Sequence, residues 1–380
     1  MGRPARALAL LALALALLVL PAGAAAKAPP GFVGVTAEDV FAGDAAYRAA
    51  NLRAQSSLGI GLIRQTFDWS TIERRRGRYD FSYHDDFVAQ AAAEGIRILP
   101  VLFNPPRFHR RTRGRATCPP RRAKSFVRFA KALVRRYGPR GKLWRERPEV
   151  WRMPITAWQI WNEPNLGIYW CNRPNARKYV AMLRKVGRGI KKVHRRATIV
   201  TAGLPPSKLS SAVPIDRFIK QMYRAGARRA FDSMAINSYA KTHRDLRKLL
   251  ASIRSLMNRR GDRRASIWIT ELGWGDGGPA HRFNVGPEGQ AKRIAKSFQL
   301  ITKKRKRWKL RGVVYYSWRD APPYPPLYRD QWGLHTGLLD IGGGGKPALD
   351  AFKDAVGRLV GPRIGRIPLS GVLEPRLPRL

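Results

Sequence analysis

Residues 155–165 have the sequence ITAWQIWNEPN, and residues 266–274 have the sequence SIWITELGW. Each segment is a short apolar run, rich in residues that favour strands, with a glutamate at its end. Runs of this kind recur along the chain and begin near Phe32, Gly61, Ile96, Ile155, Ala197, Phe231, Ser266 and Gly312. Because strands that are buried on both faces read as continuous apolar runs, the pattern predicts eight strands of a parallel sheet.

Amphipathic segments separate these runs. Between Leu246 and Met257 the apolar residues keep a helical spacing, and Arg247, Lys248 and Arg254 lie outside that stripe. A spacing of three and four residues between apolar positions is typical of a helix that packs one face against a core. We therefore expect a helix after each strand.

Another such helix is expected around residues 87–92, begun by a possible capping box at Ser82 and Asp85 and closed by Gly95. Eight alternations of strand and helix over residues 27–360 predict an α/β fold, a single (β/α)8 TIM barrel. The alternative is an open, doubly wound sheet. That fold usually carries a Gly-rich turn after its first strand, and none is present here.

Composition limits the class of protein. The chain has 380 residues, of which 44% are hydrophobic, and it carries 73 Lys+Arg against 25 Asp+Glu, a net charge of +48. This apolar content excludes a disordered chain. Two cysteines cannot form a disulfide scaffold or a four-thiolate zinc site. No interior stretch reaches the roughly 20 apolar residues that a membrane helix needs.

The two ends of the chain differ from the rest. Arg3 and Arg6 precede an apolar run at residues 7–20, and small residues follow Pro21. This pattern is typical of a secretory signal peptide, expected over residues 1–26; an uncleaved membrane anchor is the alternative. Residues 361–380 are rich in Pro and Arg and are expected to form a tail outside the barrel. The protein is therefore expected to be secreted, extracellular or associated with the cell envelope.

The interval between the third and fourth runs is the longest. It contains the basic segment Arg107–Arg122 with Cys118, and Cys171 lies after the fourth run. In a barrel both segments would project from the face at the carboxyl ends of the strands, so a disulfide between them is geometrically feasible and an exported protein permits one. Two free thiols are the alternative.

Glu163 and Glu271 end the two quoted runs. The carboxyl ends of all barrel strands converge on one face, so the two carboxylates are expected to face one cavity. Glycoside hydrolysis uses such a pair, one acid protonating the leaving oxygen while the other attacks or activates water. The plainer interpretation is that each glutamate begins a loop in solvent. The flanking tryptophans are candidate platforms for sugar rings, or ordinary core; they are Trp158, Trp161, Trp268 and Trp274.

The motifs around these acids resemble those of clan A glycoside hydrolases. Residues 161–165, WNEPN, resemble the fourth-strand signature of that clan, and residues 268–274, WITELGW, resemble its seventh-strand nucleophile motif. Residues 64–96, with DW at 68–69, IE at 72–73 and GRYDFS at 77–82, are similar to families 39, 5 and 42, and to family 39-like enzymes most closely. The likeness runs from about Phe32 to Leu359.

The resemblance implies a retaining mechanism, with Glu163 as general acid/base and Glu271 as nucleophile. It also implies the roles of the residues around them. Asn162 would hold the sugar 2-hydroxyl, Arg64 would keep Glu271 ionised, Tyr239 would donate a hydrogen bond to Glu271, and Trp318 would floor the subsite for the attacked sugar. Asn104 and Trp274 are further candidates for substrate binding.

The chain departs from these families in two places. It has Asn237 where many relatives carry a His two residues before the strand-six Tyr, and the third run ends at residues 103–106, FNPP, without a His. Both departures concern the choice of substrate rather than the acid pair.

The charge of +48 allows several interpretations, with basic clusters at residues 74–76, 110–115, 191–196 and 303–309. A solvated outer ring of helices is the simplest, and attraction to an anionic polysaccharide or cell-envelope polymer is the second. Nucleic acid is not expected as the main partner, because no recognition motif is present. The alternative function is a non-catalytic, envelope-associated barrel that binds carbohydrate and holds anionic polymers on its basic surface.

No cofactor or metal is expected. The six histidines show no ligand spacing, and the chain has no Gly-x-Ser-x-Gly motif of serine hydrolases. The partner that the sequence predicts is a carbohydrate substrate, with no membrane span after removal of the signal.

Overall fold

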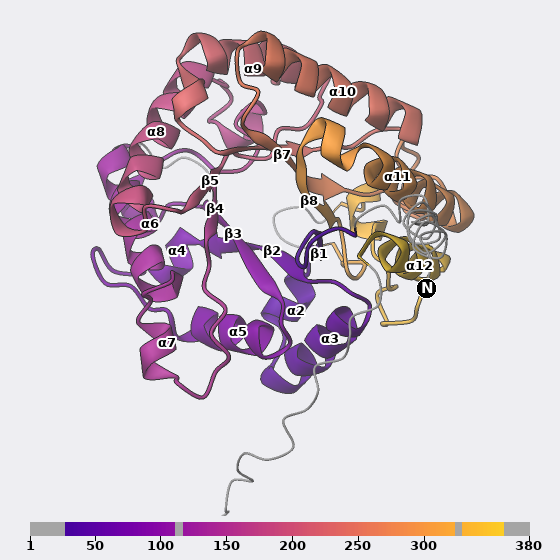
Figure 1. Ribbon diagram of the computed structural model, residues 1–380, viewed down its shortest axis with the longest axis horizontal. Helices are drawn as coiled ribbons and strands as arrows, with labels where there is room; N and C mark the ends of the chain where they lie inside the picture. Colours follow the sequence, from indigo (N-terminus) through magenta and orange to yellow (C-terminus); the bar gives the residue numbers. More distant parts are fainter. Residues whose placement is uncertain (1–26, 111–116, 324–328, 361–380) are drawn as a thin grey trace, which may run out of the picture.

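The computed structural model describes residues 27–110, 117–323 and 329–360, and it has a closed barrel of eight parallel strands in the order β1 to β8 (Figure 1). The predicted (β/α)8 barrel is confirmed. The strands are β1 (Val33–Val35), β2 (Leu62–Asp68), β3 (Arg97–Phe103), β4 (Ala157–Ile160), β5 (Thr198–Val200), β6 (Ser233–Asn237), β7 (Ser266–Leu272) and β8 (Leu310–Tyr315). Residues 1–26 and 361–380, predicted to be a signal peptide and a tail, lie outside the described residues.

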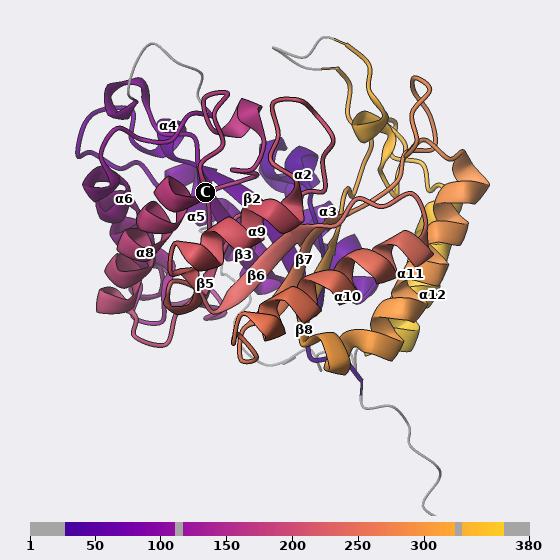
Figure 2. The ribbon, with the colours of Figure 1, turned by 90° about the horizontal axis from the view of Figure 1, so that it is seen from above.

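Helices cover the outside of the barrel, as the two ribbon views show (Figures 1 and 2). They are α2 (Glu38–Ala42), α3 (Ala45–Ser57), α4 (Trp69–Ile72), α5 (Ser82–Ala93), α6 (Ala123–Tyr137), α7 (Leu143–Glu146), α8 (Ala176–Val193), α9 (Ile215–Arg224), α10 (His243–Arg259), α11 (Pro287–Trp308) and α12 (Pro347–Val360). None of the helices in the described part of the chain is both long and apolar enough to span a bilayer.

One prediction about these helices is wrong. Ser82 and Asp85 do not form a capping box: Asp80 accepts hydrogen bonds from the backbone N–H and the hydroxyl of Ser82, while Asp85 forms an ion pair with Arg136. Arg254 lies outside the apolar stripe of α10 but does not face solvent. It is buried, and its guanidinium donates to the carbonyls of Asp262 and Ala265 at the turn after the helix.

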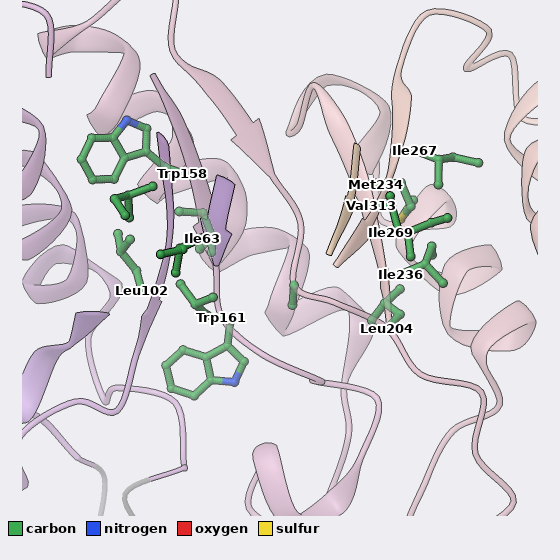
Figure 3. Packing of buried hydrophobic residues seen from close by; sticks show 14 of the residues in the cluster. Ile63, Leu102, Trp158, Trp161, Leu204, Met234, Ile236, Ile267, Ile269 and Val313 are labelled. Carbon is green, nitrogen blue, oxygen red and sulfur yellow. The ribbon is translucent and has the colours of Figure 1, made fainter. Parts of the chain in front are cut away.

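The main core lies between the strands and the surrounding helices. Figure 3 shows outward-facing side chains of β2, β3 and β4 (Ile63, Leu102 and Trp158) grouped on one side of the barrel, and side chains of β6 and β7 (among them Met234 and Ile269) on the other. These five side chains are 0% exposed, since a parallel barrel buries both faces of its strands.

A second cluster fills the inside of the barrel. It consists of Leu62, Leu99, Ala157, Val200, Ala235, Trp268 and Val314. The indole of Trp268 fits because the neighbouring strand carries Gly312, where a Cβ would lie 2.7 Å from the indole nitrogen. The interior is therefore packed rather than open.

The lining of the barrel changes character toward the carboxyl ends of the strands. Two residues beyond members of the inner cluster, strands β2, β4, β6 and β7 carry Arg64, Gln159, Asn237 and Thr270. All four side chains are buried. Because side chains alternate along a strand, these polar groups point into the barrel, as the residues of the apolar inner cluster do. The polar layer is the base of the candidate site.

Candidate active site

Glu163 follows strand β4 and Glu271 is the sixth residue of the seven-residue strand β7, so both lie at the carboxyl-end face of the barrel. Their exposed fractions are 8% and 7%. A carboxylate buried to this degree needs compensating partners. The partners of the two glutamates differ, and this difference defines the site.

Glu271 is held by a cation and a phenol. Arg64 Nη1 donates to Glu271 Oε1 at 2.9 Å, and the Tyr239 hydroxyl donates to Glu271 Oε2 at 2.5 Å. A guanidinium at this distance stabilises the ionised form of a carboxyl group. Burial and the charge of Glu271 raise the pKa of Tyr239 well above its usual value, so its hydroxyl keeps its proton.

The guanidinium of Arg64 is fixed by three neighbours. Its Nε donates to Gln159 Oε1 at 2.8 Å, and its Nη2 donates to Asn162 Oδ1 at 3.0 Å. The planar, five-donor head of arginine suits this fork of acceptors, which a lysine could not satisfy. Arg64 thus connects Glu271 to Asn162, the residue next to Glu163.

Glu163 has a neutral donor instead. Asn237 Nδ2 donates to Glu163 Oε1 at 2.7 Å, and Thr270 Oγ1 donates to Asn237 Oδ1 at 2.9 Å. The hydroxyl fixes the orientation of the amide, so that its NH₂ group faces the carboxyl. Burial, followed by the charge of Glu271, raises the pKa of Glu163 to about 8.

Two local features of the backbone place these side chains. Trp161 and Glu163 have φ angles of 78° and 43°, in the left-handed region that non-glycine residues seldom adopt. Such conformations concentrate at functional sites, where surrounding contacts stabilise them. Gly203, whose carbonyl accepts from the Glu163 N–H, leaves room for Asn237: a Cβ there would lie 2.1 Å from Asn237 Oδ1.

An aromatic cluster surrounds Tyr239. Its ring lies 5.2 Å from that of Trp332, 6.0 Å from that of Phe283 and 6.4 Å from that of Tyr316, measured between centroids. Trp332 and Tyr316 are partly exposed. The sequence motifs did not predict these residues. Tyr316 lies two residues beyond Val314 of the inner cluster, and this alternation could have identified it.

Trp318 and Trp274 do not have the exposure that sugar stacking requires, so their predicted roles are corrected. Trp318 is 2% exposed and its indole N–H donates to Asn51 of α3 at 2.9 Å. Trp274 is 0% exposed and its indole N–H donates to the carbonyl of Ala240 at 2.7 Å. The other tryptophans beside the two acids are also core; Trp158, Trp161 and Trp268 are at most 5% exposed.

Asn104 lies after strand β3, with a φ angle of 52°, and is partly exposed. Its Nδ2 donates to Asp68 Oδ2 at 2.8 Å, at the end of β2. Asn104 therefore joins the carboxyl ends of two strands on the face that carries the glutamates. Its predicted contact with substrate stays a prediction.

Cys118 and Cys171 form a disulfide with a Cα–Cα distance of 5.1 Å, as the sequence predicts. The bond ties the connection after β3 to the connection after β4, which carries Glu163. Thr117 adds a hydrogen bond from its hydroxyl to the carbonyl of Ile168 at 2.6 Å. In residues 27–110, 117–323 and 329–360, no three His, Cys, Asp or Glu side chains are grouped as metal ligands.

Comparison with known proteins gives a fold but no sequence family. No family model and no curated protein matches the chain. Among solved structures, a family 39 glycoside hydrolase from Bacteroides cellulosilyticus WH2 is 19% identical over 87% of this chain and 64% of its own length, with a TM-score of 0.60. The chain thus spans slightly less than two thirds of that protein.

Two further structures are similar. A GH39 β-xylosidase from Caulobacter crescentus is 19% identical over 86% of this chain and 72% of its own, with a TM-score of 0.61. A GH5_18 protein from Streptomyces cattleya, in complex with GlcNAc, is 14% identical over 88% and 81%, with a TM-score of 0.65. The structural neighbours of this chain are therefore glycoside hydrolases of families 39 and 5, in clan A, whose (β/α)8 fold it shares.

Proposed function

We propose that this chain is a retaining glycoside hydrolase, with Glu163 as general acid/base and Glu271 as nucleophile. One observation supports this more than any other: two buried glutamates at one end of the barrel have opposite surroundings. Arg64 and Tyr239 stabilise a charged Glu271, whereas burial raises the pKa of Glu163 to about 8 and keeps it protonated at neutral pH. A pair of carboxyl groups with separated protonation states is what acid-assisted glycosyl transfer needs.

In the first step, Glu163 gives its proton to the oxygen of the scissile bond as that bond breaks. The Glu271 carboxylate attacks the anomeric carbon and forms a covalent ester with the sugar. Asn162, whose Oδ1 accepts from Arg64, has its NH₂ group available for the sugar 2-hydroxyl. Tyr316 and Trp332, rather than Trp318, are the aromatic rings with surface to offer the sugar.

In the second step, Glu163 takes a proton from water, which attacks the anomeric carbon and releases Glu271. The charge of Glu271 is one of the two causes that raise the pKa of Glu163. Formation of the ester removes this charge, so the pKa of Glu163 falls at the stage where it must act as a base. The same residue can then serve both steps.

The proposed substrate is a β-linked oligo- or polysaccharide, and the proposed location is outside the cytoplasm. Solved structures of similar fold include a β-xylosidase and an exo-β-1,4-mannosidase, and their names support the β-linkage. The Cys118–Cys171 bond supports export, because disulfides persist in oxidising compartments.

The covalent intermediate gives the direct test. The protein is incubated with a panel of activated 2-deoxy-2-fluoro β-glycosides, whose electron-poor ring slows the second step. We expect an intact-mass increase of one fluoro-sugar and, after proteolysis, a modified peptide that contains Glu271. Product anomers from a hydrolysed aryl β-glycoside, followed by NMR, should retain the β-configuration.

Nucleophile rescue separates the two glutamates. With azide added, Glu271→Ala should form the α-glycosyl azide and Glu163→Ala the β-glycosyl azide, because azide replaces a different carboxylate in each case. Glu149→Ala, an exposed glutamate, is the matched control and should keep full activity. Sugar binding without hydrolysis of any glycoside in the panel would instead favour the non-catalytic carbohydrate-binding barrel.

A further inference from the structure

Two adjoining hollows lie away from the glutamates, with cavity volumes of about 470 and 530 Å³, and they share Lys191 and Lys192. The first is also lined by Arg184, Arg188, Arg228 and Arg229. We call the surface that contains both hollows the basic face.

The second hollow extends the same surface. It adds six cations from two further segments: Arg135, Arg140, Lys142, Arg145, Arg195 and Arg196. Figure 1 shows the elements that carry the basic face, α6, α7 and α8, on one side of the barrel, across from α11.

The topology places the basic face opposite the candidate active site. Its residues lie in the last turn of α6, in α8 from Arg184 onward, in α7, and in the segments that lead into β4, β5 and β6. In a (β/α)8 barrel these segments meet the amino ends of the strands, whereas Glu163 and Glu271 lie at the carboxyl ends. Side chains here are free of any role in the proposed hydrolysis.

Negative charge is scarce on this surface. Asp232 is the one acid among the residues that line the two hollows, and it already accepts from Lys191 Nζ at 2.9 Å and from the backbone N–H of Ile199 at 2.8 Å. Glu146, nearby on α7, pairs with Arg136. No ion pair joins the other cations of the basic face to a carboxylate in the part of the chain that the structure describes.

The helix dipole explains only part of the cluster. Cations in the last turn of a helix interact favourably with its partial negative charge, which accounts for Lys191 and Lys192 of α8 and Arg135 of α6. It does not account for Arg140, which lies outside a helix. A concave surface of like charges instead favours a ligand of opposite charge.

We propose that the basic face binds a linear, carboxylate-bearing polysaccharide and holds the protein on it, with the active site facing away. Guanidinium groups bind carboxylates through paired hydrogen bonds, and the shared lysines make the two hollows one continuous track. Nucleic acid is the less suitable polyanion, because Phe231, the one phenylalanine, tyrosine or tryptophan among the lining residues, is 6% exposed and offers little surface for base stacking. This proposal does not depend on the glycosidase activity.

The test measures the binding of fluorescently labelled polygalacturonate fragments to the full chain by anisotropy. The patch variant is Lys192→Glu/Arg196→Glu/Arg229→Glu. The control variant, Lys303→Glu/Lys306→Glu/Arg307→Glu, changes the net charge equally, at exposed positions of α11 across the barrel. We expect the patch variant to bind at least about tenfold more weakly and the control to bind like the unchanged chain.

Salt and probe comparisons complete the design. Affinity of the unchanged chain should fall at least about tenfold between roughly 50 and 200 mM NaCl. Neutral dextran of the same length should not bind. Should the triple Glu variant fail to fold, the same three positions changed to Gln give the comparison.

Three results would overturn the proposal. One is an equal loss of affinity in the patch and control variants, which would mean that only net charge matters. Another is an absence of binding to polygalacturonate at about 150 mM salt, close to physiological ionic strength. The third is tighter binding of duplex DNA than of polygalacturonate, lost in the same patch variant, which would assign the basic face to nucleic acid.

Discussion

Asn237 modulates the protonation of Glu163, which burial and the charge of Glu271 determine more strongly. Its amide donates to Glu163 Oε1 at 2.7 Å, and this bond lowers the pKa of Glu163 against the larger effect of burial. An amide cannot change its own charge, so the pH dependence of the site should report the two glutamates without a third titrating group.

Removal of this donor should shift the basic limb of the pH profile. In Asn237→Ala the charged form of Glu163 loses a hydrogen bond, so its pKa rises, and the fall of kcat/KM at high pH should move upward from about 8 by up to about one pH unit. We expect kcat/KM at neutral pH to decrease about tenfold because Glu163 is less well oriented. The measurement is a pH–rate profile on an aryl glycoside.

Thr270→Val is the matched control for Asn237. It keeps the shape of the side chain and removes only the hydroxyl that orients the Asn237 amide. A shift in the same direction but smaller than that of Asn237→Ala would agree with an indirect role of Thr270. An unchanged basic limb in both variants would contradict the assignment of Glu163 as the group that titrates.

The buried acid should also reduce stability at neutral pH. A glutamate in the unfolded chain ionises near pH 4.3, whereas the pKa of folded Glu163 is raised to about 8, so the stability contributed by the protonated acid is lost as pH rises through this interval. Glu163→Gln should therefore raise Tm by a few degrees, ~2–6 °C, at pH 8 and by less at pH 4. Calorimetry at both pH values measures this difference.

Glu149→Gln is the control for the stability measurement, since this residue is exposed and should give the same Tm as the unchanged chain at both pH values. A Glu163→Gln variant that is less stable at pH 8 than at pH 4, relative to the unchanged chain, would show that Glu163 is better solvated than its burial indicates.

The sequence predicted the residues that contact Glu271 but not the partly exposed aromatic residues around them. Arg64 and Tyr239 were expected from the resemblance to clan A hydrolases, and both side chains contact Glu271. Trp318 could not be placed correctly. Strand β8 ends at Tyr315, so the alternation of side chains does not continue to Trp318, which packs against α3 instead of the mouth.

The disulfide acts between elements, on the connections that frame the mouth of the barrel. Cys118 and Cys171 are 53 residues apart in sequence, and closure of a loop of this length stabilises a fold by about 2–4 kcal/mol. Cys118→Ala/Cys171→Ala should lose about that much free energy of unfolding in urea. KM should rise more than kcat falls, because the bond positions the connections after β3 and β4 while Arg64 and Tyr239 still hold Glu271.

Reduction of the unchanged chain serves as the check on this prediction. Dithiothreitol should lower its stability to that of the double alanine variant, which should itself be insensitive to the reductant. A variant whose kcat falls while KM stays constant would show that the bond positions Glu163 itself, through the connection that carries it.

At the scale of elements, hydrophobic pattern was a good guide to the positions of the strands and a poor guide to the partners of individual polar side chains. Each predicted strand start lies within two residues of the observed one, as with Phe231 against Ser233 and Gly312 against Leu310. Because each strand is buried on both faces, every strand can be recognised in the sequence as an apolar run. The burial of Arg254 could not be predicted, because its partners are backbone carbonyls beyond the helix, which a helical spacing cannot reveal.

The inside of the barrel divides into an apolar layer, which provides stability, and a polar layer nearer the carboxyl ends of the strands, which provides the chemistry. Trp268 and Thr270 are two residues apart on β7. Trp268 belongs to the apolar layer and Thr270 to the polar layer. Polar side chains such as Arg64 and Gln159 would be costly inside the barrel without their mutual hydrogen bonds. The close packing below them excludes water and fixes the strands that carry them.

Gly312→Ala tests this division. The added Cβ would lie 2.7 Å from the indole nitrogen of Trp268 and 2.9 Å from the carbonyl oxygen of Phe32. The inner cluster must therefore shift, and the free energy of unfolding should fall by about 1–3 kcal/mol. The pH limits of kcat/KM should stay unchanged, because the polar layer is not touched. Gly357→Ala in α12 is the control: its Cβ meets nothing within 4 Å, and a helical alanine should leave stability equal or increase it by up to about 1 kcal/mol. A Gly312→Ala variant of unchanged Tm with a displaced pH profile would show that the two parts of the barrel are not independent.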